Sequence, residues 1–167
     1  PEAFADLVES AERAVAKRLK LPNAKVRHLG LSAWSAGYGA IGKILAQPEG
    51  KEWVDTVILL DGLHSGYSHS GGTLNEAQLA PFVEFAQRAA ARRRFMYVTH
   101  SSIIPPGYAS TTETANYLIA ALGGKPRPSA PRGTDPMGLD LISWYVAGNF
   151  HVRGYSGNGK LDHCAQL

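Results

Sequence analysis

The chain has 167 residues, of which 44% are hydrophobic and 19% are charged, and its formal net charge at pH 7 is +3. These values are ordinary for a globular protein, exclude disordered and collagen-like chains, and fit a single domain over residues 1–167. No apolar run approaches the roughly 18–20 residues of a membrane span, and the small basic excess lacks the interleaved aromatic residues of a nucleic-acid surface. The single cysteine, Cys164, excludes an intrachain disulfide and leaves the localisation unknown.

The chain begins with an amphipathic pattern and then alternates between two kinds of element. Apolar residues recur at helical period over residues 1–21, and Pro22 and Asn23 predict the end of that helix. Short apolar segments predict strands at 25–34, 56–62, 94–100 and 149–155. Helical patterns lie between them at 37–46, 77–93 and 110–124.

The C-terminal third of the chain is less regular. Residues 125–138 are rich in proline and predict an excursion or linker, residues 139–148 are of undetermined type, and residues 156–167 predict a turn or loop. The alternation as a whole predicts an α/β fold, with a predominantly parallel sheet of four to five strands and helices on both faces. In such a sheet, ligands bind at the carboxyl ends of the strands.

Ser35 lies where the first strand is expected to turn into a helix. A serine on such a turn projects its hydroxyl above the sheet, and the turn is so sharp that only small residues fit two positions before and after it. Here those residues are Ala33 and Gly37. The N–H of Ala36 would open the helix, where it could donate to a developing oxyanion. A helix-capping serine in a packed turn is the alternative reading.

Two further candidates each follow a later predicted strand. Asp61 ends the apolar run VILLD, and His163 follows the last strand. A serine nucleophile needs a general base, and the base needs an acid that orients it, which is the chemistry of Ser35, His163 and Asp61 in that order. Asp162 adjoins His163, but consecutive side chains seldom face one another.

With these residues the chain resembles the catalytic half of the α/β-hydrolase family, from LGLSAWSAGYGA through VILLDGLH and FMYVTH to FHVRGYSGNGKLDH. In that family nucleophile, acid and histidine follow successive strands in this order. The resemblance assigns the nucleophile to Ser35, the acid to Asp61 and the base to His163. The acid position is that of pancreatic-type lipases, one strand earlier than is usual, and Glu113 is a weaker substitute.

The resemblance also implies parts that this chain does not supply. The family has several strands and an oxyanion-hole loop before the first helix seen here, and a closing helix after the histidine. We therefore expect either a fragment, with a second chain supplying the missing half, or a pared-down version of the fold. The second oxyanion donor is not identified.

The remaining candidates surround this site. We expect a mouth lined by Trp34, Tyr38 and the loops at 64–72 and 100–108, with His64 facing the substrate and no metal or organic cofactor. His100 either lines this mouth or caps the next turn. His64 and His69 could join Asp61 at a metal ion, although the spacing matches no regular ligand motif.

The function indicated is a serine hydrolase that cleaves a small-molecule ester, or less readily an amide, through an acyl-enzyme. A non-catalytic, incomplete chain that acts with a partner is the first alternative. A nucleotide-binding Rossmann-type domain is the second, because Gly37, Gly39 and Gly42 have the spacing G-x-G-x-x-G after a strand.

Overall fold

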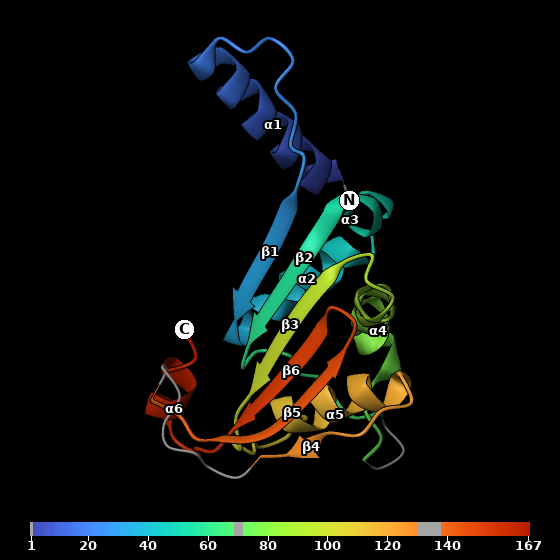
Figure 1. The fold of residues 1–167 in the computed structure, drawn as a ribbon, viewed down its shortest axis with the longest axis vertical. Coiled ribbons are helices and arrows are strands. Elements are labelled where there is room, and N and C mark those ends of the chain that lie inside the picture. The colour runs from blue at the N-terminus through green and yellow to red at the C-terminus, as the bar shows by residue number, and fades with distance from the viewer. Residues whose placement is uncertain (1, 69–71, 130–137) are drawn as a thin grey trace.

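The computed structural model describes residues 2–68, 72–129 and 138–167 and has an α/β fold built on one six-stranded sheet (Figure 1). The strands are β1 (Leu29–Trp34), β2 (Val54–Leu60), β3 (Phe95–His100), β4 (Arg127–Pro128), β5 (Leu141–Ala147) and β6 (Phe150–Tyr155). The helices are α1 (Glu2–Leu19), the 3₁₀ turn η1 (Ser35–Gly37), α2 (Tyr38–Leu45), α3 (Pro48–Trp53), α4 (Glu76–Ala90), α5 (Thr111–Ala121) and α6 (Lys160–Cys164).

The sheet is mostly parallel. Its strand order is β1-β2-β3-β6-β5-β4, with β1, β2, β3 and β6 parallel and the β6–β5 and β5–β4 pairs antiparallel. The α/β class and the largely parallel sheet are therefore confirmed, but the expected four to five strands are six. The additional pairing comes from β5, in the segment of undetermined type, and from β4, a two-residue strand in the proline-rich segment.

The expectation of helices on both faces is wrong for the residues that the structure describes. In Figure 1, α2 and α5 pass behind the strands, α3 and α4 lie to the right of the sheet, and no helix is drawn in front of it. Along the chain, each of the parallel strands β1, β2, β3 and β6 is added on the same side of the one before it. When right-handed crossovers all step across the sheet in the same direction, their helices lie on the same face. A second helical layer needs a reversal of strand order, which these strands lack.

Residue burial follows this one-sided arrangement. In β2, Val57 and Leu59 are buried against the helices, whereas Ile58 and Leu60 on the other face are only half-buried. The covered face packs against apolar residues of α2, α4 and α5, among them Ile41, Phe82 and Leu118. Although the segment of β2 is apolar almost throughout, only one face of this strand belongs to the core.

Two short helices differ from the sequence reading. The sequence predicts no helix between residue 46 and the strand at 56–62, but α3 begins at Pro48. Proline suits the first turn of a helix, because its missing N–H leaves no helical bond unmade there. Residues 156–167 were expected to form a turn, and Lys160–Cys164 within them form the short helix α6. Among the described helices, none is long and apolar enough to cross a membrane.

Candidate active site

Ser35 occupies a strained turn at the carboxyl end of β1. Its φ is +54°, in the left-handed region that residues with a side chain rarely adopt. Such a conformation costs on the order of 1–3 kcal/mol and is typical of positions where a side chain must be held in a particular direction. β1 ends at Trp34 and the 3₁₀ turn begins at Ser35, so the backbone reverses at the serine itself.

Small residues are required around this turn. A Cβ added to Gly37 would lie 3.0 Å from the Cβ of Ala33, so the residues two before and two after Ser35 face one another. A Cβ added to Gly62 would lie 2.5 Å from the carbonyl oxygen of Ser35 and 2.7 Å from its nitrogen. The segment after β2 therefore passes directly against the serine backbone.

Asp61 follows β2 and is held by donors from three directions. Its carboxylate is 2% exposed. Oδ1 accepts hydrogen bonds from the Ser101 N–H at 2.8 Å and the Thr111 hydroxyl at 2.6 Å, and Oδ2 lies 2.7 Å from Nδ1 of His163. Burial raises the pKa of Asp61, but the hydrogen bonds from Thr111, His163 and Ser101 outweigh it and lower that pKa overall, so the carboxylate stays ionised at neutral pH.

His163 meets Asp61 across 102 residues of chain. Because an ionised carboxylate can only accept, Nδ1 of His163 is the donor, and Nε2 of the neutral ring is left with a lone pair. The histidine is carried by α6, where its own N–H donates to the Gly159 carbonyl at 3.2 Å. Asp162 turns away from it and accepts from the Gly159 N–H at 2.9 Å.

Ser35 and His163 line the same hollow, of about 290 Å³, together with Asp61 and the apolar side chains of Ile103 and Pro105. In the described part of the chain, the Ser35 hydroxyl forms no hydrogen bond to His163. Such bonds are often long in ligand-free sites and shorten when substrate binds. A second hollow, of about 310 Å³, lies on the Ala36 side of Ser35 and also contains Tyr38 and Gln78.

His64 and Tyr108 belong to both hollows. Nδ1 of His64 lies 3.0 Å from the Ala109 carbonyl, which can only accept, so this nitrogen carries the proton and Nε2 is free to accept. Its ring meets Tyr108 edge-on at a centroid distance of 5.0 Å and Tyr38 at 5.8 Å. Tyr38 and His64 of the expected mouth, and Ala36, the expected oxyanion donor, thus line the hollows beside Ser35.

Two expected mouth residues lie elsewhere. His100 is 3% exposed, lines neither hollow, and its Nδ1 is 2.8 Å from the Thr112 hydroxyl. It packs so closely on β6 that a Cβ at Gly154 would lie 2.3 Å from its Cε1, and burial lowers its pKa and keeps the ring neutral. Trp34 also lines neither hollow. Its ring stacks on His163 at a centroid distance of 4.6 Å.

The weaker candidates are engaged in other interactions. Glu113 accepts from the N–H and the hydroxyl of Ser110 at 2.8 and 2.7 Å, which caps α5, and from the Tyr67 hydroxyl at 2.9 Å. Of the three spaced glycines, Gly37 lies in the turn before α2, and Gly39 and Gly42 lie inside α2.

No group of three His, Cys, Asp or Glu side chains that could share a metal ion occurs within the described ranges. His69, the other histidine considered for such a site, lies outside them.

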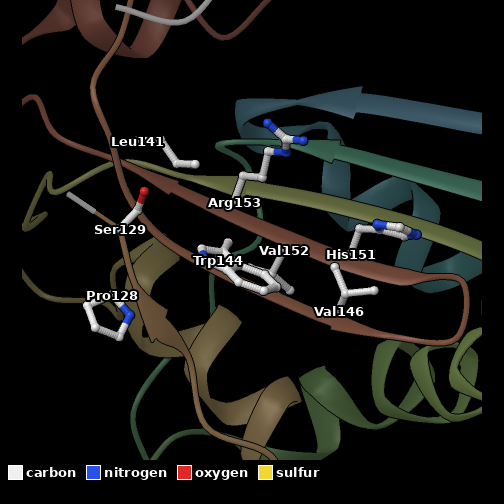
Figure 2. Close-up of a pocket in the computed structure, with 8 residues that line it drawn as sticks. All are labelled: Pro128, Ser129, Leu141, Trp144, Val146, His151, Val152 and Arg153. Atoms are coloured by element: carbon white, nitrogen blue, oxygen red, sulfur yellow. The ribbon is translucent and has the colours of Figure 1, made fainter. Parts of the chain in front are cut away.

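Sequence reasoning missed Ser101, Thr111 and the stacking of Trp34. Thr111 follows Ser110, which caps α5, and a threonine in the first turn of a helix gives no sequence signal for a contact with a carboxylate 50 residues away. A further hollow, of about 500 Å³, lies over β5 and β6 and includes Trp144, His151 and Arg153 (Figure 2). It shares no lining residue with the hollows at Ser35.

Comparison with protein-family models, curated protein sequences and solved structures gave no match. The proposal for the function therefore rests on the geometry at Ser35, Asp61 and His163.

Proposed function

We propose that the protein is a serine hydrolase that cleaves small esters through an acyl-enzyme. One observation carries the proposal. Asp61 and His163, far apart in sequence, are joined at 2.7 Å, and they share a hollow with a serine held at φ +54°. A packed capping serine would have no need of a strained backbone or of an oriented imidazole beside it.

The proposed reaction has two halves, acylation of Ser35 and hydrolysis of the acyl-enzyme. Nε2 of His163 takes the proton of the Ser35 hydroxyl as Oγ bonds to the ester carbonyl carbon, and the carbonyl oxygen becomes an oxyanion. His163 then gives that proton to the leaving alkoxide as the carbon–oxygen bond breaks. Water repeats the sequence on the acyl-enzyme, which releases the acid and restores Ser35. Asp61 holds the ring through Nδ1 and stabilises the transient imidazolium.

The two hollows suggest where the parts of the substrate bind. The leaving oxygen must lie beside His163 to receive its proton, which directs the alcohol part into the hollow with Ile103 and Pro105. The Ala36 N–H, in the first turn after β1, has no helical partner and supports an oxyanion on its own side of Ser35. Both hollows are at the small end of ligand pockets, so the proposal favours short acyl and alcohol groups.

The test is covalent labelling with a fluorophosphonate probe, read by intact mass, beside hydrolysis of p-nitrophenyl acetate, butyrate and octanoate. The expected result is one adduct on Ser35, no adduct in Ser35→Ala or after unfolding, and faster turnover of the two shorter esters. Ser32→Ala is the matched control, because Ser32 lies on the same strand and lines neither hollow. A folded protein that neither takes the label nor hydrolyses any of the esters would refute the proposal.

A further inference from the structure

Trp34 makes two separate contacts with His163, one to the backbone and one to the ring. Its indole Nε1–H donates to the His163 carbonyl oxygen at 3.0 Å. Its ring lies over the imidazole at a centroid distance of 4.6 Å and an interplanar angle of 27°. The two contacts restrain different parts of the histidine, because the first fixes where α6 sits against β1 and the second fixes the plane of the ring.

Few other contacts could provide this restraint. α6 has five residues, and helices this short are marginal on their own. Within the described residues, the His163 ring forms one hydrogen bond, from Nδ1 to Asp61. One such bond fixes the position of Nδ1 but does not by itself fix the plane of the ring. The Trp34 indole, stacked on one face of the imidazole, prevents the ring plane from tilting toward that side. The side chain of His163 is 20% exposed, so water would otherwise reach this surface.

Trp34 also immediately precedes Ser35. The last residue of β1 therefore orients the base, and the next residue supplies the nucleophile. An indole face close to a ring that becomes an imidazolium also stabilises the positive charge, since a cation within about 6 Å of a tryptophan ring is attracted by it.

We infer that Trp34 is a positioning residue for His163, which it holds through the hydrogen bond to the carbonyl and through the stack on the imidazole. The inference rests on the proposed hydrolase function. The indole lines neither hollow beside Ser35, so it acts through the base and not through substrate contact.

Two variants separate the contacts. Trp34→Phe keeps an aromatic face and loses the N–H donor, and Trp34→Leu loses both. We expect kcat for p-nitrophenyl acetate to fall about fivefold in the first and about 30-fold in the second, with KM changed by less than about threefold. Trp53→Phe is the control, because Trp53 packs on Phe4 away from Ser35, and it should keep the kcat of the original protein.

A second readout does not depend on turnover. In the original protein the indole ring current shifts the His163 ring proton resonances, which are assigned by their loss in His163→Gln. We expect Trp34→Leu to move these resonances toward values for an unstacked histidine, and Trp34→Phe to move them less.

The outcomes are distinct. Original kcat in Trp34→Leu, or unmoved His163 resonances in that variant, would overturn the inference. If Trp34→Leu does not fold, Trp34→Phe decides: a fivefold loss at constant KM supports the inference, and an unchanged kcat overturns it. Absence of labelling and hydrolysis in the original protein would instead defeat the proposed function, while the resonances would still show whether Trp34 positions the ring.

Discussion

Replacing Thr111 with valine removes one of the three groups that hold the buried Asp61 carboxylate. The Thr111 hydroxyl donates to Oδ1 at 2.6 Å and is itself 3% exposed, so water cannot easily take its place. A hydrogen bond to a charged group contributes about 1.5–3 kcal/mol. We therefore expect Thr111→Val to lower the free energy of unfolding by about 1.5–3 kcal/mol at pH 7.

The loss should depend on pH. The pKa of Asp61 is lower in the folded protein than its ordinary value of 3.8, so the stability from its ionisation is present above pH 3.8 and is lost as pH falls through the folded pKa. The Thr111 bond is one cause of this lowering, and the variant should have a higher folded pKa at Asp61. The stability difference between the two proteins should therefore shrink as both carboxyl groups become protonated.

Thr114 provides the matched control. It lies on the same helix and is fully buried, but its hydroxyl donates to the neutral Leu63 carbonyl at 2.6 Å. Urea unfolding from pH 7 to pH 2.5 should show a loss that is constant with pH for Thr114→Val and a loss that declines at low pH for Thr111→Val. Parallel pH dependences in the two variants, or full stability of Thr111→Val at pH 7, would refute the reasoning.

Three further predictions concern the serine turn and the acid. Ser35→Gly should abolish labelling, but its free energy of unfolding should exceed that of Ser35→Ala by about 1 kcal/mol, because glycine adopts positive φ without penalty. Equal free energies of unfolding in the two variants would contradict this. Gly62→Ala should lower both the stability in thermal unfolding and the turnover in ester assays, since its Cβ would meet the Ser35 backbone. Gly39→Ala should lower neither, because no atom lies within 4 Å of the position its Cβ would take. Asp61→Asn should fold and lose about 10³–10⁴-fold in kcat, and steady-state kinetics showing less than a tenfold loss would exclude Asp61 as the orienting acid.

Periodicity and local chemistry made much of the fold predictable. The alternation of apolar segments placed four of the six strands, because side-chain period depends on near neighbours in the chain. The small residues around Ser35 pointed to a tight turn, since Ala33 and Gly37 must face each other there. The order of Ser35, Asp61 and His163 after successive strands also placed them at one edge of the sheet, because parallel strands bring their carboxyl ends together.

Other features depend on contacts that local pattern cannot encode. Which face the helices cover follows from the direction in which the strand order advances, and that is a property of the whole sheet. β4 and β5 pair antiparallel to the end of the sheet, and β4 is too short to have a period.

The surroundings of the three residues were likewise decided only by the tertiary structure. His100 is the last residue of β3, close to the sheet edge where Asp61 follows β2, but it packs against Gly154 of β6 and lines neither hollow. Thr111 and Trp34 reach Asp61 and His163 across 50 and 129 residues respectively. The sequence by itself indicated Ser35, Asp61 and His163 as candidates for the proposed chemistry, because their residue types and turns are local. Only the fold determined what holds the Asp61 carboxylate ionised and the His163 ring in place, because burial and long-range hydrogen bonds exist only once the sheet has formed.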